Sequence, residues 1–133
     1  MHHIEIYVSD IAKTRAFYDK LLVDELGFKV FQEWDKGVSY KQGAGAYLVF
    51  VQVDESKNDG AFNRTKVGLN HLAFRVNSRS KLDKMRLSYL QDADVSMLYD
   101  NRYPFASGLG HYALYMEDPD RIKIEIVAEE FCI

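Results

Sequence analysis

The feature that most constrains the fold is an internal repeat of one short pattern. The segments HIEIYVSDIAK, from His3, and HLAFRVNSRSK, from His71, match at the histidine, at three apolar positions and at the final lysine. Each begins with the two-residue alternation of a half-buried strand and then changes to the 3.6-residue period of an amphipathic helix. The repeat therefore predicts two copies of one supersecondary unit.

Each predicted helix is followed by signals for three short strands. In the first half, apolar segments at 28–34, 38–41 and 46–53 are separated by glycine-containing turns. In the second half, the corresponding segments are 95–99, 111–117 and 122–128. We therefore expect one α+β domain of two tandem βαβββ modules, at residues 1–53 and 69–128, with a connection at 54–68 and a tail at 129–133. The modules are expected to form a curved mixed sheet cup with the helices on its outer face.

Composition limits the classes of function open to this chain. Its 133 residues carry a net charge of −3, with 47% apolar and 28% charged residues, which is typical of a globular domain. Basic residues are scattered singly, so no nucleic-acid partner is expected. No apolar segment approaches the roughly 20 residues that span a bilayer, and Cys132, the only cysteine, excludes an internal disulfide. We expect a cytoplasmic protein that binds neither nucleic acid nor membrane.

The faces of the predicted strands bring a few polar side chains together. The apolar residues of each strand should face the helix, which leaves the alternate residues on the opposite, open face. His3, His71 and Glu125 fall on this open face, from the first, fifth and eighth strands. Two imidazoles and one carboxylate have the composition of a triad that binds a divalent ion and leaves positions open for substrate and water. These three residues are the predicted metal ligands.

Other residues near these positions have more than one interpretation. His2 competes with His3 as a ligand, although its side chain is expected on the helix side, and the Met1-His2-His3 start is also compatible with a tag remnant. His111 orients a metal ligand, contacts substrate or is simply the exposed start of a strand. Arg75 contacts substrate or pairs with Glu5 across strands.

The sequence resembles the vicinal oxygen chelate superfamily, which includes glyoxalase I, fosfomycin-resistance proteins, extradiol dioxygenases and bleomycin-binding proteins. The resemblance covers nearly the whole chain and rests on HIEIYVSD, NHLAFRVN and EDPDRIKIEIV. In that superfamily a histidine of the first strand, a histidine of the fifth and a glutamate of the eighth hold the metal, and His3, His71 and Glu125 match them. The resemblance implies one divalent ion (Mn, Fe, Zn or Ni), a small-molecule substrate and a homodimer. It also implies that Tyr115 is a catalytic hydrogen-bond donor or acid.

One departure from the family pattern bears on the reaction. Glyoxalase I adds a second glutamate from the fourth strand, and that residue takes part in moving the proton. Superposing AYLVFVQV on RIKIEIVA places Phe50 opposite Glu125, with Gln52 next on the same face. A three-ligand site is therefore expected, methylglyoxal isomerisation is disfavoured, and Phe50 and Gln52 are expected to shape the substrate pocket. The predicted substrate contacts are Phe50, Gln52, Arg75 and His111.

Three functions are compatible with these features. The favoured one is a metal-dependent lyase, isomerase or group-adding enzyme that chelates vicinal oxygens of a small organic substrate. A ring-cleaving dioxygenase requires iron(II) at the same triad. A non-catalytic small-molecule sequestering protein uses the same cup without metal, but the presence of two histidines and a glutamate argues against it. Beyond Arg75 and Lys123, the sequence gives little indication of a cationic pocket for an anionic substrate.

Overall fold

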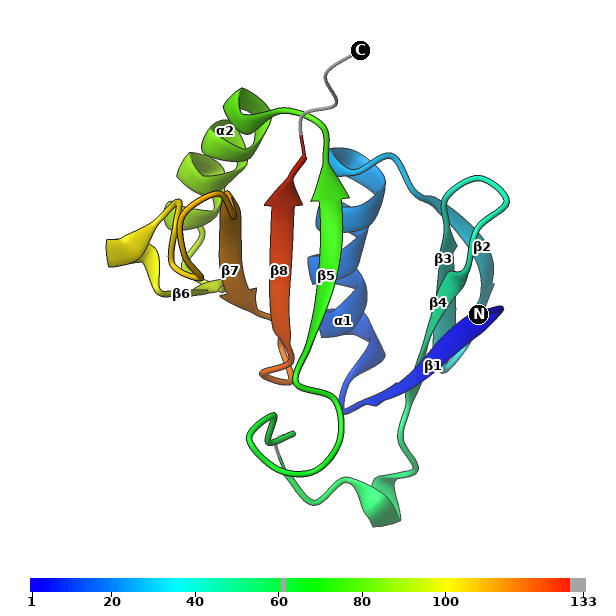
Figure 1. The fold of residues 1–133 in the computed structure, drawn as a ribbon. Helices are drawn as coiled ribbons and strands as arrows, with labels where there is room; N and C mark the ends of the chain where they lie inside the picture. The colour runs from blue at the N-terminus through cyan, green and yellow to red at the C-terminus, as the bar shows by residue number, and fades with distance from the viewer. Residues whose placement is uncertain (61, 130–133) are drawn as a thin grey trace. The chain divides into compact units, whose positions relative to one another are not determined.

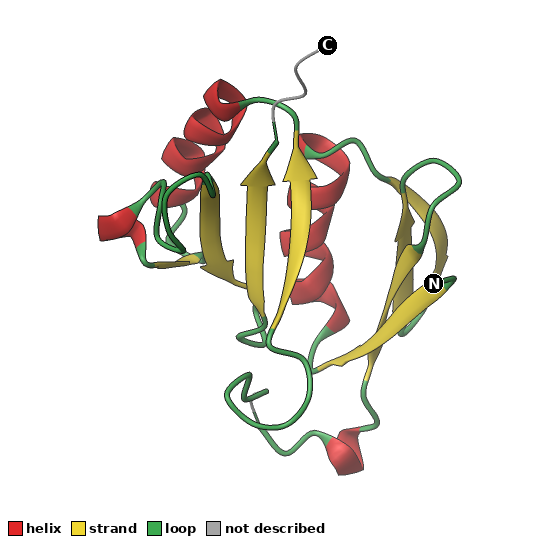
Figure 2. Cartoon of the chain, in the orientation of Figure 1, coloured by secondary structure: helices red, strands yellow, loops and turns green. Residues whose placement is uncertain are grey.

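Two compact units make up the chain. The computed structural model describes residues 1–60 and 62–129, and the chain divides into residues 1–61 and 62–133 (Figure 1). Each unit has one four-stranded mixed sheet and one main α-helix (Figure 2). The predicted α+β class with two tandem βαβββ modules is confirmed.

The first unit forms its sheet around a parallel pair of strands. Its elements are β1 (His3–Val8), α1 (Ile11–Tyr18), the π-helical segment η1 (Asp19–Glu25), β2 (Lys29–Trp34), β3 (Gly37–Lys41) and β4 (Tyr47–Gln52). The strand order is β1-β4-β3-β2, with β1 parallel to β4 and the other neighbours antiparallel. Short turns join the antiparallel neighbours, as expected for strands that follow each other directly.

Helix α1 packs against β3 and β4 of this sheet. Asp10 caps the helix, because its side chain accepts hydrogen bonds from two backbone N–H groups of the first turn at 3.0 and 3.2 Å. At the other end of α1, the fully buried Tyr18 stacks on Phe50 of β4 with ring centroids 4.2 Å apart. Phe50 and the residues that alternate with it thus belong to the helix-facing side of the sheet.

The second unit repeats the same pairing scheme. Its elements are β5 (His71–Val76), α2 (Arg79–Leu90), β6 (Ser96–Leu98), the short 3-10 helix η3 (Asp100–Arg102), β7 (Ala113–Glu117) and β8 (Lys123–Ala128). The short 3-10 helix η2 (Glu55–Lys57) follows β4 and belongs to the first unit. The strand order is β5-β8-β7-β6, with β5 parallel to β8 and the remaining neighbours antiparallel. Equivalent order and direction in both sheets agree with the internal repeat.

The core of the second unit lies between α2 and its sheet. Leu82, Met85 and Tyr89 of α2 are buried, and Ile124 and Ile126 of β8 are fully buried. Since these isoleucines flank Glu125 in the sequence, the glutamate points to the opposite face of the sheet. The fold thus positions Glu125 through the burial of its two neighbours.

The predicted element boundaries differ from the observed ones by at most two residues, as at β7, which begins at Ala113 rather than at position 111. Among the described residues, no helix combines the length and apolar character needed to cross a bilayer. Cys132 lies outside the described residues.

Candidate functional site

The open face of the second sheet carries several of the predicted site residues. Glu125 of β8 pairs in register with Ala73 of β5 on one side and with Tyr115 of β7 on the other. His71 lies two residues before Ala73 and therefore projects from the same face. His111 precedes β7 by two residues. The sheet register thus gathers these side chains around one carboxylate.

Glu125 is held between two imidazoles. Its Oε1 atom lies 3.2 Å from Nε2 of His71, and its Oε2 atom lies 2.6 Å from Nε2 of His111. The Glu125 side chain is only 6% exposed, whereas the side chains of His71 and His111 are 35% and 43% exposed. A carboxylate buried to this degree needs charged or hydrogen-bonding partners, and the two histidines supply them.

The orientation of the His71 ring is set by its neighbour Asn70. The Asn70 amide nitrogen donates to the carbonyl of Arg64 at 3.4 Å, which directs the amide oxygen toward Nδ1 of His71 at 2.8 Å. We assign the proton of the neutral imidazole to Nδ1, because an amide oxygen can only accept. The Nε2 lone pair of His71 then faces Glu125.

His111 makes the complementary contact. A neutral imidazole that bonds a carboxylate at 2.6 Å does so by donating, so we assign the His111 proton to Nε2. The two histidines therefore play different parts: His111 donates to Oε2 of Glu125, and His71 presents a lone pair beside Oε1. One oxygen of the carboxylate is thus engaged and the other is available.

The separation of Nε2 of His71 and Oε1 of Glu125 suits two ligands of one ion. With metal–ligand distances of about 2.0–2.2 Å, adjacent donor atoms lie about 2.8–3.1 Å apart at octahedral angles and about 3.3–3.6 Å apart at tetrahedral angles. The observed 3.2 Å lies between these two ranges. The same geometry also serves an imidazolium–carboxylate ion pair when His71 is protonated, so the donor set fits a divalent ion without requiring one.

Within the described part of the chain, no group of three or more His, Cys, Asp or Glu side chains is arranged to hold a metal ion. The second unit brings together His71, Glu125 and His111, but the carboxylate lies between the two imidazoles and contacts both. A metal ion bound by His71 and Glu125 therefore needs at least one further ligand.

Tyr115 lies beside this cluster. It is 3% exposed, and its hydroxyl forms a short hydrogen bond with Ser107 from the loop between η3 and β7. Burial raises the pKa of the Tyr115 phenol, and the Glu125 charge acts in the same direction, against the lowering effect of the Ser107 hydrogen bond. The phenol thus stays protonated well above neutral pH and is available as a hydrogen-bond donor.

A lysine and a second tyrosine extend the same face. Nζ of Lys123 lies 5.0 Å from the ring centroid of Tyr99 and 5.1 Å from that of Tyr115. Tyr99 has a left-handed backbone with φ of 56°, which is uncommon for a residue other than glycine and often marks functional sites. No sequence pattern indicated a site role for Asn70, Tyr99 or Ser107, since only the local backbone geometry and the loop path bring them to the site.

His3 lies on the first sheet at the start of β1. Its ring stacks on Tyr47 of β4 with centroids 4.9 Å apart and an interplanar angle of 10°. His2 contacts both residues: its Nδ1 lies 2.8 Å from Nδ1 of His3, and its ring lies edge-on to Tyr47. The expectation that His2 points away from His3 is therefore wrong, because His2 precedes β1 and does not follow its alternation.

The expected positions of Phe50 and Gln52 are also corrected. Phe50 is fully buried against α1, and Oε1 of Gln52 accepts the backbone N–H of Ile11 at 3.0 Å, at the start of that helix. Both therefore have structural roles on the helix-facing side. The residue of β4 that is equivalent to Glu125 is Val49, since it pairs with Glu5 as Glu125 pairs with Ala73.

The first unit therefore still lacks a second glutamate on β4, because Val49 is also apolar.

Arg75 differs from expectation as well. Its guanidinium pairs with Glu129 at 2.7 Å rather than with Glu5, and both members of the pair are largely exposed. An exposed pair of this kind contributes little to stability.

Two βαβββ units with a His–Glu cluster on the open sheet face define a glyoxalase-type protein. Comparison with known proteins agrees with this class. A family model described as the Glyoxalase/Bleomycin resistance protein/Dioxygenase superfamily matches residues 1–126. The chain belongs to this superfamily.

The similar proteins include an uncharacterised protein, a proposed glyoxalase and a lactoylglutathione lyase. The chain is 48% identical over 128 residues to the uncharacterised protein YqjT of Bacillus subtilis (strain 168), covering 96% of this chain and 98% of YqjT. The crystal structure of a proposed glyoxalase from Bacillus halodurans shares 46% identity, with a TM-score of 0.89 over 96% of this chain and 94% of that chain. A lactoylglutathione lyase from Agrobacterium tumefaciens, with 18% identity and a TM-score of 0.63 over 96% of this chain and 91% of that chain, shares the fold.

Proposed function

We propose that this protein is a metal-dependent enzyme that acts on a small organic substrate chelated through vicinal oxygens. The proposed ligands are His3, His71 and Glu125. A divalent ion held there would act as a Lewis acid on the substrate oxygens. The cytoplasmic location and the homodimer expected from the sequence are part of the same proposal.

The observation that carries this proposal is the pairing of Nε2 of His71 with Oε1 of Glu125 at 3.2 Å. Asn70 keeps the lone pair of His71 directed toward the site, as outer partners of metal-bound histidines commonly do. His111 occupies the other carboxylate oxygen, which favours attachment of Glu125 through one oxygen only. A site with few protein ligands keeps positions open for substrate.

Tyr115 is the proposed catalytic residue. Its buried phenol holds its proton and lies on the same face as Glu125. It would donate a hydrogen bond to the substrate oxygen on which negative charge develops, which stabilises the transition state. The proposed reaction is a lyase, isomerase or group-addition reaction. Proton transfer as in glyoxalase I is disfavoured, because Val49 stands where a second carboxylate would be required.

Metal content tests the proposal. Tag-free wild-type protein is incubated with manganese, iron or zinc and then desalted. It is expected to retain about one ion per protein chain, and the Glu125→Gln variant is expected to lose this ion. Glu129→Gln is the matched control, because it removes an exposed carboxylate paired with Arg75. A wild type that retains no ion, or a Glu125→Gln variant that retains as much as wild type, would contradict the metal site.

A further inference from the structure

A lysine lies beside the proposed metal ligands of the second unit. Lys123 of β8 is the register partner of His71 and precedes Glu125 by two residues, so its side chain leaves the same open face of the sheet. Lys123 is half-buried. In the described part of the chain, no carboxylate lies within ion-pair distance of its ammonium group. A half-buried cation without an acidic partner favours binding of an external anion.

The acidic residue next to Lys123 on the neighbouring strand is already engaged. Glu117 of β7 is the register partner of Lys123 on the side away from His71. Its carboxylate pairs with two arginines, Arg121 at 3.1 Å and Arg64 at 3.5 Å. Two cations thus balance the single charge of Glu117, and the charge of Lys123 remains uncompensated.

Two aromatic rings position the ammonium group of Lys123. Its Nζ atom lies 5.0 Å from the ring centroid of Tyr99 and 5.1 Å from that of Tyr115, and these two rings meet edge to face. Cation–π contacts hold an ammonium group in place and leave its N–H groups able to donate to an oxyanion. The guanidinium of Arg102 lies 5.4 Å from the Tyr99 ring and adds positive charge to the same surface. The ammonium group is therefore fixed beside the phenol that is proposed as the catalytic donor.

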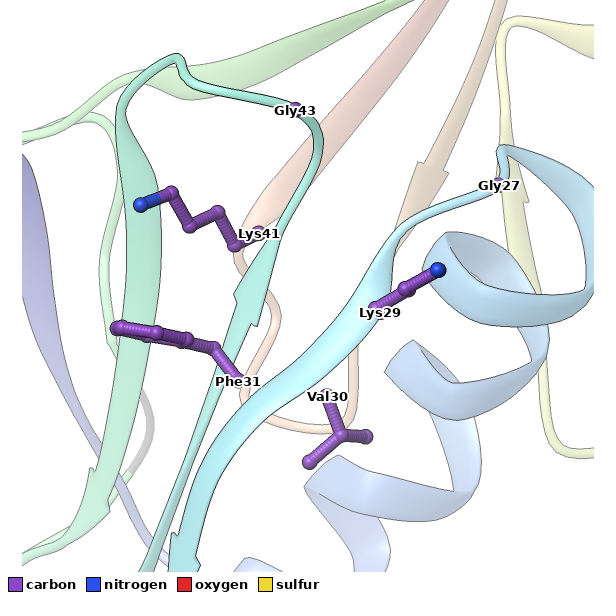
Figure 3. Close-up of a pocket in the computed structure, with 6 residues that line it drawn as sticks. All are labelled: Gly27, Lys29, Val30, Phe31, Lys41 and Gly43. Atoms are coloured by element: carbon purple, nitrogen blue, oxygen red, sulfur yellow. The ribbon is translucent and has the colours of Figure 1, made fainter.

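The open face of the first unit carries a comparable arrangement. Nζ of Lys41 lies 4.9 Å from the ring centroid of Phe31 and 5.7 Å from that of Tyr47. Figure 3 shows the side chains of Lys41 and Phe31 extending to the same side of β2 and β3. Tyr47 in turn stacks on the proposed metal ligand His3. Each unit thus has a lysine that contacts two aromatic rings near a proposed ligand, and such cations favour a negatively charged substrate.

We propose that the substrate is a 2-hydroxy- or 2-oxocarboxylate and that Lys123 binds its carboxylate group. This inference rests on the proposed metal-dependent function. The hydroxyl or keto oxygen and one carboxylate oxygen of such a compound are the vicinal oxygens that a divalent ion chelates. The other carboxylate oxygen accepts a hydrogen bond from the Lys123 ammonium group, and Tyr115 donates to the hydroxyl or keto oxygen. One ammonium group matches the single charge of a carboxylate.

Amide NMR titrations of zinc-loaded, full-length protein test the proposal. The probes are lactate, pyruvate and lactamide, which has the shape and the vicinal oxygens of lactate without its charge. Lactate or pyruvate is expected to shift the amide resonances of Tyr99, Lys123 and Glu125 saturably, and the tighter of the two identifies the second chelating oxygen. Lactamide is expected to bind more weakly. Because zinc itself attracts anions, the contribution of the lysine is measured by substitution.

Lys123→Met keeps a side chain of similar length beside the two rings and removes the charge. It is expected to lower the affinity for the tighter carboxylate about tenfold, the size of a charge-assisted hydrogen bond, and to leave the affinity for lactamide unchanged. Lys84→Met removes an exposed lysine of α2 and is the matched control, which should bind like wild type. Unchanged resonances elsewhere establish that both variants are folded.

The same titrations of EDTA-treated protein separate this proposal from the metal site. A wild type that retains no zinc contradicts the proposed function, and the comparison of wild type with Lys123→Met is then decided in the metal-free protein, where carboxylate binding is expected to be weaker but still to depend on the lysine. Where zinc is retained, the zinc-loaded protein decides. In the deciding form, no saturable shift with either carboxylate, equal carboxylate affinity in Lys123→Met, or an equal loss of lactamide affinity would overturn the proposal.

Discussion

At the scale of single residues, the proposed chemistry depends on which nitrogen of each histidine carries a proton. Asn70 and Glu125 assign opposite tautomers to His71 and His111, so one ring offers a lone pair and the other offers a donor. The two histidines contact the same carboxylate yet are expected to act differently. His71 binds the ion, and His111 positions Glu125.

Replacement of Asn70 tests the assigned tautomer. Asn70→Ala removes the acceptor that holds the Nδ1 proton of His71 and is expected to weaken metal binding by about 10–100-fold, the usual cost of losing an outer partner. Asn70→Asp keeps an acceptor and should retain the affinity. Metal affinities measured by competition with a chromophoric chelator give the comparison.

The matched control is Asn77→Ala, which removes an exposed asparagine just after β5 and should bind metal like wild type. Equal affinities for Asn70→Ala and Asn77→Ala would show that Asn70 does not orient a metal-binding ring.

At the scale of elements, the turn before β8 determines where Glu125 lies. Oδ1 of Asp118 accepts the backbone N–H groups of Asp120 and Ile122 at 2.8 and 2.9 Å, and Asp118 is only 5% exposed. These two bonds close the turn directly before the strand begins. The motif EDPDRIKIEIV is one of the three segments on which the family resemblance rests, and its Asp118 helps to start β8 in one register.

Removal of this side chain should therefore destabilise the fold. Asp118→Ala leaves two backbone N–H groups near the core without their acceptor and is expected to cost about 1–3 kcal/mol in the free energy of unfolding. Urea denaturation followed by circular dichroism measures this change. Asp94→Ala, at an exposed loop position, should lie within about 0.5 kcal/mol of wild type. Similar losses for both variants would contradict a specific role for the turn.

Strand identity and strand faces could be predicted from the sequence where apolar and polar residues alternate. In β5 and β8 the alternation is visible, and His71 and Glu125 fall on the face opposite Leu72 and Ile124, as predicted. In β4 almost every residue is apolar, so its sequence does not indicate a face.

The error at Phe50 follows from that loss of signal. Alignment of the segments AYLVFVQV and RIKIEIVA by sequence alone placed β4 one residue out of register with β8. A shift of one residue exchanges the two faces of a strand. Only the observed pairing of His3 with Tyr47, and of His71 with Lys123, shows which residues correspond. Contacts such as Ser107 with Tyr115 depend on the path of a loop, which local sequence patterns do not encode.

At the scale of the whole molecule, the two units share one architecture but carry different side chains at equivalent positions. The second unit carries Glu125 on β8, and the first unit has Val49 at the equivalent position on β4. In the first unit, Tyr47 of β4 instead forms an aromatic cluster with His3 and Phe31. The second unit is thus proposed to supply two of the three metal ligands.

Two glutamate substitutions test the corrected correspondence between the copies. Phe50→Glu places a charge in the core under α1 and removes the stack on Tyr18, and it is expected to cost more than about 3 kcal/mol in stability. Val49→Glu places a carboxylate at the position equivalent to Glu125 and is expected to gain thermal stability when zinc is added. Thermal unfolding of both variants with and without zinc provides the measurement. A zinc-dependent gain in thermal stability for Phe50→Glu but not for Val49→Glu would show that Phe50, and not Val49, corresponds to Glu125.

The most direct test of the central claim is cadmium–nitrogen coupling measured by NMR in cadmium-loaded protein with labelled histidines. Such coupling appears only where a nitrogen binds the metal. The proposed site predicts coupling at Nε2 of His3 and His71 and none at His111, which donates its Nε2 proton to Glu125. Coupling at His111 without His71, or at no histidine, would contradict the proposed metal site.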